Sequence, residues 1–157
     1  MNQYEFAAAR SGDAAEILEI YKSLIDTTPA WSEEYPTAEI INTDIKKGRL
    51  YILRDGKNIV SAASLCLDNE ILDLGWDIKK PIELSRLVVV KAMQRRGIGA
   101  LMLQLTLQKA KDKNFGGMIL LVHKDNFAAA LYEKNGFKRC GEVMLYGHKF
   151  YKYQLYF

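Results

Sequence analysis

The fold of this chain is decided by the stretch Gln94-Arg95-Arg96-Gly97-Ile98-Gly99-Ala100. The stretch follows the apolar run Leu87-Val88-Val89-Val90, and it opens a segment of helical periodicity from Ile98 to Lys113. A strand that enters a glycine-rich turn and then a helix presents free backbone N–H groups and the positive end of the helix dipole to one place. The pattern therefore predicts a site for a phosphorylated ligand at this turn.

Three kinds of phosphate-binding turn compete for this stretch. A dinucleotide-binding turn needs a third glycine and an acidic residue about twenty positions later, and here Met102 stands at the third position. A P-loop ends in Gly-Lys-Ser/Thr, which this stretch lacks. The remaining form, Gln/Arg-x-x-Gly-x-Gly/Ala after a strand, resembles the acyl-coenzyme A turn of the GNAT family of N-acetyltransferases. If this motif is taken alone, the alternative is a strand-to-helix turn whose glycines have a purely structural role.

A second motif supports the same family. The stretch Asn126-Phe127-Ala128-Ala129-Ala130-Leu131-Tyr132-Glu133-Lys134-Asn135-Gly136-Phe137 follows the next predicted strand. It resembles the family's later motif, in which Asn, Ala and the run Tyr-Glu-Lys-x-Gly-Phe recur. Two motifs in the family's order identify the chain as a member of the GNAT family, with a specific resemblance from about Glu83 to Phe137. Lys91 stands where many members carry proline.

The predicted elements agree with the fold that this resemblance implies. Periodicity and turn residues predict strands at residues 4–10, 50–54, 59–67, 81–90, 118–122, 138–146 and 150–156, and helices at residues 14–25, 37–47, 98–113 and 127–135. The third helix is expected to bury Leu101, Met102, Leu105, Leu107 and Ala110. The expected fold is α/β, with a mixed, mostly antiparallel twisted sheet and helices on both faces. A central parallel strand pair is expected to splay at the cofactor site, within one acyltransferase domain over residues 1–157.

Composition excludes several classes of function. A net charge of +3 on 157 residues is too small to indicate a nucleic-acid partner. No apolar run approaches the ~20 residues of a membrane span, and no leader is recognisable, so a cytoplasmic protein without a membrane partner is expected. Cys66 and Cys140 are too few for a disulfide framework and are expected to be small buried hydrophobes. His123 and His148 lack metal-ligand spacing, so no metal is expected.

The resemblance implies acetyl-coenzyme A as the co-substrate. In the family, the diphosphate lies on the turn that here runs from Arg95 to Ala100, and Gln94 before it belongs to the implied cofactor-binding set. Gly97 and Gly99 let the backbone approach the phosphates, and Arg95 and Arg96 add charge at the rim, with solvated arginines as the alternative. The strand Leu87-Val88-Val89 is expected to pair with the pantetheine arm, and the Leu87 N–H to polarise the thioester carbonyl. Asn126, Tyr132 and Lys134 complete the implied cofactor-binding set.

Two residues are candidates for the chemistry. Tyr132 matches the family's general acid, which protonates the coenzyme A thiolate as it leaves; the alternative is a ring packed against Phe127 or Leu131. Glu83 matches the position of a catalytic base in one branch of the family. Its alternatives are an edge-strand carboxylate in solvent, a partner of Arg86, or replacement by a chain of waters. Asn126 also fits a helix N-cap with Phe127 at the first helical position.

The acceptor site is expected at Trp31, Glu33, Tyr35 and Tyr146. Aromatic rings can hold an apolar or cationic body, and a carboxylate attracts an amine; a surface loop whose Trp31 covers the core is the alternative. The expected acceptor is an amine of a small molecule or of a peptide or protein, and a homodimer is a compatible assembly. A non-catalytic acyl-coenzyme A sensor is the alternative function, disfavoured by Tyr132. A nucleotide-binding module is disfavoured by the missing third glycine.

Overall fold

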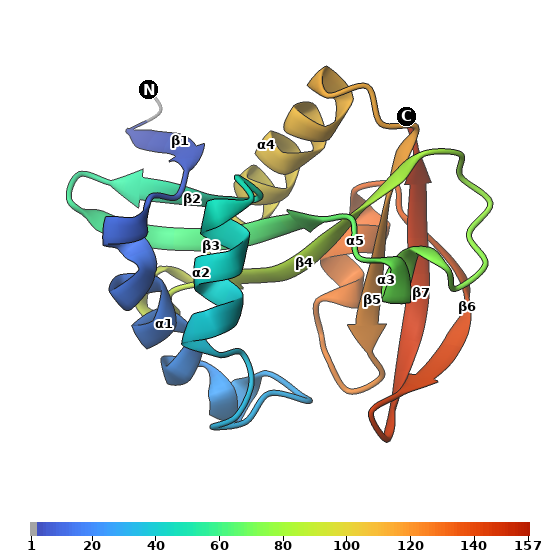
Figure 1. Cartoon of the computed structure of the whole chain (residues 1–157), viewed down its shortest axis with the longest axis horizontal. Helices are drawn as coiled ribbons and strands as arrows, with labels where there is room; N and C mark the ends of the chain where they lie inside the picture. Colours follow the sequence, from blue (N-terminus) through green and yellow to red (C-terminus); the bar gives the residue numbers. More distant parts are fainter. Residues whose placement is uncertain (1–2) are drawn as a thin grey trace. The chain divides into compact units, whose positions relative to one another are not determined.

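The structure is a computed structural model that describes residues 3–157. Its strands form a seven-stranded sheet in the order β1-β2-β3-β4-β5-β7-β6 (Figure 1). The strands are β1 (Tyr4–Ala8), β2 (Leu50–Asp55), β3 (Asn58–Cys66), β4 (Pro81–Val89), β5 (Gly117–His123), β6 (Lys138–Leu145) and β7 (His148–Tyr156). The α-helices are α1 (Ala14–Ser23), α2 (Ala38–Lys46), α3 (Asn69–Leu72), α4 (Ile98–Asp112) and α5 (Ala129–Lys134).

The predicted fold class is confirmed. The pairs β1–β2, β2–β3, β5–β7 and β6–β7 are antiparallel, and β4 pairs with β5 in parallel. A parallel pair needs a crossover connection, and α4 supplies it. Among residues 3–157, no helix combines the length and the apolar composition that a bilayer span requires.

The chain divides into two compact units. Unit 1 comprises residues 3–64 and Arg86–Thr106, and unit 2 comprises Leu65–Ser85 and Leu107–Phe157. Strand β4 passes from unit 2 into unit 1 between Ser85 and Arg86, and α4 passes back after Thr106.

The core of unit 1 lies between two helices and the hairpin β2–β3. Helix α1 contributes Ile17, Ile20, Tyr21 and Leu24, whose spacing places them on one helical face. They pack with Ile41 of α2 and with alternate strand residues such as Leu50 and Ile52. Figure 1 shows α1 and α2 in front of these strands and the first part of α4 behind them. Helices therefore cover both faces of the sheet in this unit.

Several predicted boundaries in unit 1 are wrong by a few residues. Strand β1 ends at Ala8, before Arg10, because the Arg10 N–H donates to the Asp13 carboxylate at 2.9 Å and a 3₁₀ turn follows at Ser11–Asp13. Helix α1 ends at Ser23, and Ile25–Thr27 forms a second 3₁₀ turn. Thr37 precedes α2, where its Oγ1 accepts the Ile40 N–H at 3.2 Å.

The buried stripe of α4 differs from the predicted one. Leu103 and Thr106 are fully buried, together with Met102, Leu107 and Ala110, whereas Leu101 and Leu105 are only half-buried. The prediction counted apolar residues and so passed over a threonine. Burial of Thr106 is possible because its hydroxyl donates to the backbone carbonyls of Met102 and Leu103, at 3.0 and 2.9 Å.

Unit 2 is built around β5. This strand pairs with β4 from Pro81↔Gly117 to Glu83↔Ile119, and over its whole length with β7, from Gly117↔Tyr156 to His123↔Phe150. Its start is crowded. A Cβ on Gly117 would lie 2.5 Å from the Leu155 carbonyl oxygen, and a Cβ on Gly116 would lie 2.1 Å from the Lys79 carbonyl oxygen. Only glycine fits at these two positions.

Three predictions in unit 2 are corrected. Helix α5 begins at Ala129 rather than Phe127, because the Asn126 side-chain oxygen accepts the Ala128 N–H at 2.8 Å in a preceding turn. Asn126 is therefore not the N-cap, a position that Ala128 occupies. Helix α3 has only one turn, too short for periodicity to predict. Cys66 is buried as expected, but Cys140 is exposed.

Candidate functional site

The glycine-rich turn has the backbone geometry of an anion site. Arg95 and Gly97 both adopt left-handed conformations, with φ of 65° and 79°, directly before α4 begins at Ile98. Alternating left- and right-handed residues turn successive N–H groups toward one point, and the first N–H groups of a helix add to them. A Cβ on Gly97 would meet no atom within 4 Å. The turn therefore has an open backbone, as an anion-binding site requires.

The strand before the turn is fixed by hydrogen bonds within unit 1. The Val88 carbonyl accepts the Ser61 hydroxyl at 2.7 Å, and the Val90 N–H donates to the Val60 carbonyl at 2.9 Å. The Gln94 side-chain amide donates to the Val89 carbonyl at 3.1 Å, and so connects the turn to the strand. Arg95 and Arg96 are exposed. Unit 1 thus holds the predicted residues from Leu87 to Ala100 in one ordered segment.

A buried charge cluster, which the sequence analysis missed, lies in the same unit. Asp44 is 1% exposed and accepts hydrogen bonds from Arg49 (2.7 Å), Arg86 (2.7 Å) and Ser64 (2.8 Å). Burial by itself would raise the pKa of Asp44, but the Arg86 charge and the hydrogen bonds from these three partners lower it overall. The spacing along α2 could have indicated this burial, because Asp44 lies three residues after buried Ile41 and therefore on the same face of the helix.

The predicted acceptor loop combines a packed residue with exposed ones. Trp31 contacts Tyr21 edge-to-face, with ring centroids 5.3 Å apart, and packs against the core of unit 1. Trp31 is partly buried against this core. Glu33 and Tyr35 lie at the surface, and the Tyr35 hydroxyl accepts a hydrogen bond from Arg86 at 3.1 Å.

Tyr132 lies on α5 in unit 2 and is 8% exposed. Its ring contacts Phe137 edge-to-face at 5.7 Å, whereas Phe127, the partner proposed from the sequence, is 97% exposed. Burial raises the pKa of the Tyr132 phenol above its ordinary value. A phenol is protonated at neutral pH even at its ordinary pKa of about 10, so the hydroxyl carries a proton that it can donate. Lys134 is exposed on the same helix.

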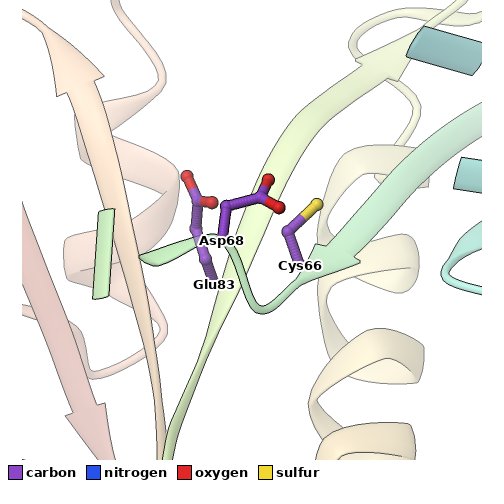
Figure 2. A group of neighbouring side chains, drawn as sticks. All are labelled: Cys66, Asp68 and Glu83. Carbon is purple, nitrogen blue, oxygen red and sulfur yellow. The ribbon is translucent and has the colours of Figure 1, made fainter. Parts of the chain in front are cut away.

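Glu83 is a buried carboxylate, 7% exposed, on β4. Its interpretation as an edge-strand residue is wrong, because β4 lies between β3 and β5 in the strand order. Figure 2 shows its side chain beside those of Asp68 and Cys66, extending to the same side, and one ligand atom from each lies within 4.8 Å of the others. A thiol and two carboxylates are donors that could hold a divalent cation.

The remaining polar groups of unit 2 surround the β6–β7 hairpin. His123 is 7% exposed, and its Nε2 lies 3.0 Å from His148 Nδ1. Its Nδ1 accepts the Asp125 N–H at 3.1 Å, so the proton of the neutral ring sits on Nε2. Burial, and then the neighbouring His148, lower the pKa of His123. Tyr146 is exposed, and its hydroxyl donates to the Glu70 carboxylate of α3.

The comparisons with known proteins agree with this geometry. A family model for an acetyltransferase (GNAT) domain matches residues 14–155. A search of curated proteins found no match. Similar solved structures include a PaiA N-acetyltransferase from Thermoplasma acidophilum in complex with coenzyme A, which is 18% identical, with 100% of both chains covered and a TM-score of 0.78.

Two further structures resemble the chain over nearly its whole length. A ribosomal-protein-alanine N-acetyltransferase from Brucella melitensis is 20% identical, with 98% of this chain and 99% of that chain covered and a TM-score of 0.78. A chimeric spermidine N-acetyltransferase from Vibrio cholerae is 19% identical, with 99% and 96% covered and a TM-score of 0.74. These likenesses concern the fold, whereas the family match spans most of the sequence. The chain therefore belongs to the GNAT acetyltransferase family.

Proposed function

We propose that this protein is an acetyl-CoA-dependent N-acetyltransferase, in which a primary amine attacks the acetyl group directly in a ternary complex. The observation that carries the proposal is the turn before α4, with left-handed Arg95 and Gly97, in a chain of the GNAT family. The coenzyme A bound to the similar structure from Thermoplasma acidophilum supports this co-substrate. The family match over residues 14–155 supports one acyltransferase domain.

The residues of unit 1 hold the cofactor in this proposal. Backbone N–H groups from Arg95 to Ala100 bind the diphosphate, and the guanidinium groups of Arg95 and Arg96 add charge. The backbone of Leu87-Val88-Val89 pairs with the pantetheine arm. The Leu87 N–H donates to the thioester carbonyl oxygen, where negative charge develops as the amine adds. In unit 2, Asn126 and Lys134 contact the cofactor.

The proton transfers belong to unit 2. Acetyl-CoA supplies an acetyl group activated as a thioester. The carboxylate of Glu83 accepts the proton that the cationic amine must lose before its nitrogen can attack the acetyl carbon. The second proton of the nitrogen passes to solvent as the amide forms. The Tyr132 hydroxyl gives its proton to the sulfur as the carbon–sulfur bond breaks. The Tyr132 phenol is protonated at neutral pH, as a proton donor must be before the reaction.

The acceptor is proposed to be an amine of a small molecule or of a peptide or protein. Glu33 attracts the cationic amine, and the rings of Trp31, Tyr35 and Tyr146 contact its carbon skeleton. Both acceptor classes have support, because the names of the similar structures include a ribosomal-protein-alanine acetyltransferase and a spermidine acetyltransferase.

The test is thiol release from acetyl-CoA, measured with a panel of amines in the presence of a chelator. We expect turnover with at least one amine, and a kcat about 10²-fold lower in Tyr132→Phe, since the variant lacks only the proton donor. Tyr153→Phe is the matched control. Tyr153 is 1% exposed, donates to Glu133 at 2.6 Å and has a pKa raised to about 12, yet it has no proposed role.

Two outcomes would contradict parts of the proposal. Tight coenzyme A binding without thiol release for any amine would overturn the enzyme assignment and leave an acyl-coenzyme A sensor. Equal kcat values for wild type and Tyr132→Phe would remove Tyr132 as the general acid but leave the activity in place.

A further inference from the structure

We propose that Asp44 and Arg86 are a positioning pair: their ion pair holds Arg86 in a left-handed backbone conformation and thereby aims the N–H of Leu87. The inference rests on the proposed function, which assigns that N–H to the thioester carbonyl. Neither side chain needs to touch the substrate for this role.

The backbone of Arg86 is the unusual feature. Its φ is 54°, although it lies inside β4. A residue with a Cβ is strained in this conformation and keeps it only where its surroundings hold it there. The torsion angles of Arg86 set the orientation of the peptide group that joins it to the next residue. The N–H of that peptide belongs to Leu87.

The side chain of Arg86 is held at two points. Its Nη2 donates to Asp44 Oδ2 at 2.7 Å, and its Nη1 donates to the Tyr35 hydroxyl at 3.1 Å. The guanidinium is planar with donors in a fixed fork, so two contacts define its direction. An anchor of this kind constrains the backbone from which the side chain starts.

The anchor is itself immobile. Asp44 is 1% exposed, and its carboxylate also accepts hydrogen bonds from Arg49 Nε at 2.7 Å and from Ser64 Oγ at 2.8 Å. Asp44 lies on α2, and these two partners come from the segment before β2 and from β3. A buried carboxylate with this many charge-assisted bonds has one favourable position.

The strand after Arg86 is fixed separately. Ser61 Oγ donates to the Val88 carbonyl at 2.7 Å, and the Val90 N–H donates to the Val60 carbonyl at 2.9 Å. After Leu87, the backbone is therefore held by hydrogen bonds to β3. Before Leu87, the backbone of Arg86 is held through its side chain by Asp44. The contact with Tyr35 also connects the predicted acceptor loop to the peptide that is aimed at the thioester.

The decisive experiment compares Arg86→Ala with Arg86→Gly. Both variants lose the guanidinium, but glycine adopts a positive φ without steric cost and alanine does not. We expect Arg86→Ala to lower kcat at least 10-fold, and Arg86→Gly to recover most of that loss. The Kd of coenzyme A, which has no acetyl carbonyl, should be unchanged in both. Glycine also relieves backbone strain at a positive φ, so kcat is compared per folded protein, with the folded fraction of each variant measured by circular dichroism.

A second variant tests Asp44 through a double-mutant cycle. We expect Asp44→Asn to lower kcat in the wild-type background and to have little further effect in Arg86→Gly, because the glycine backbone no longer needs the anchor. NMR couplings report φ at residue 86 without reference to activity. They should show a positive value in the wild type and a loss of it in Asp44→Asn.

The outcomes separate the two proposals. Equal kcat losses in Arg86→Ala and Arg86→Gly, with an active wild type, would overturn the positioning role and leave the proposed function intact. An unchanged positive φ in Asp44→Asn would also overturn it. Absence of thiol release by the wild type would overturn the proposed function, and the positioning role with it.

Discussion

Asp44 is the residue on which the geometry of unit 1 depends most directly. It is a carboxylate inside an apolar helix–sheet interface, and it is tolerated there because three donors satisfy it. Removing the charge of one member of such a cluster leaves the others uncompensated, which is more costly than the net contribution of the intact cluster. Replacement of Asp44 should therefore affect stability as well as turnover.

The first prediction concerns pH. Because its folded-state pKa lies below the ordinary 3.8, ionised Asp44 stabilises the fold at pH values above 3.8. This contribution is lost as the pH falls through the lower folded-state pKa. Urea unfolding should find Asp44→Asn less stable than wild type by about 3 kcal/mol at pH 7, with the difference narrowing below pH 3.8. Exposed Asp26 provides the control, Asp26→Asn. A difference independent of pH would contradict the assignment.

The second prediction concerns Glu83. If it takes the proton of the amine, Glu83→Gln should lower kcat by at least ~10²-fold at neutral pH. Asp68→Asn, which changes the neighbouring carboxylate of the cluster in Figure 2, should have a much smaller effect. A chelator in the assay removes any contribution from a cation. At a pH near the amine's own pKa, about 10, the base is no longer needed and the loss should shrink. Equal losses in both variants would contradict a specific base.

At the scale of elements, regular patterns such as apolar runs and helical periodicity are predictable from the sequence, whereas a single turn is not. Strand β5 was predicted from a continuous apolar run, and its burial between β4 and β7 follows from that run. Helix α3 is a single turn and has no periodicity to detect. The start of α5 was misplaced because the side chain of Asn126 bonds to a neighbouring backbone N–H in a turn as readily as at a helix cap.

The third prediction belongs to α2. Thr37→Ala removes the acceptor of the Ile40 N–H and should destabilise the protein by about 1 kcal/mol, the usual contribution of an N-cap. Asn42→Ala, on the exposed face of the same helix, is the control and should be neutral or slightly stabilising. Chemical denaturation measures both. If the two variants have the same stability, Thr37 does not cap the helix.

For the whole molecule, the motifs were predictable and the long-range pairs were not. The turn from Gln94 to Ala100 is contiguous in sequence, so its local pattern predicts a phosphorylated ligand, and the second motif from Asn126 to Phe137 is needed to predict coenzyme A. Arg86 and Asp44 are 42 positions apart, and nothing in a single sequence pairs them. The left-handed backbone of Arg86 is equally invisible, because arginine has no preference for that conformation. Sequence analysis therefore located the proposed cofactor site but not what holds its geometry.

The fourth prediction tests the crowded start of β5. In Gly117→Ala the new Cβ would lie 2.5 Å from the Leu155 carbonyl oxygen, so the strand pairing with β7 must shift. We expect a loss of about 3 kcal/mol in the free energy of unfolding. Gly12→Ala is the control, since a Cβ there meets no atom within 4 Å and its φ is not positive. Similar stabilities for the two variants would contradict this account of β5.

The glycine pair at the start of β5 has a consequence for how variation in this chain is interpreted. Selection for folding alone would eliminate every other amino acid at Gly116 and Gly117, because backbone carbonyls occupy the space that a side chain needs. In a complete mutational scan these positions would be as intolerant as those that hold a ligand. An abundance assay run beside an activity assay would distinguish these glycines from ligand-binding positions, because substitution of Gly117 would lower both the abundance and the activity of the protein.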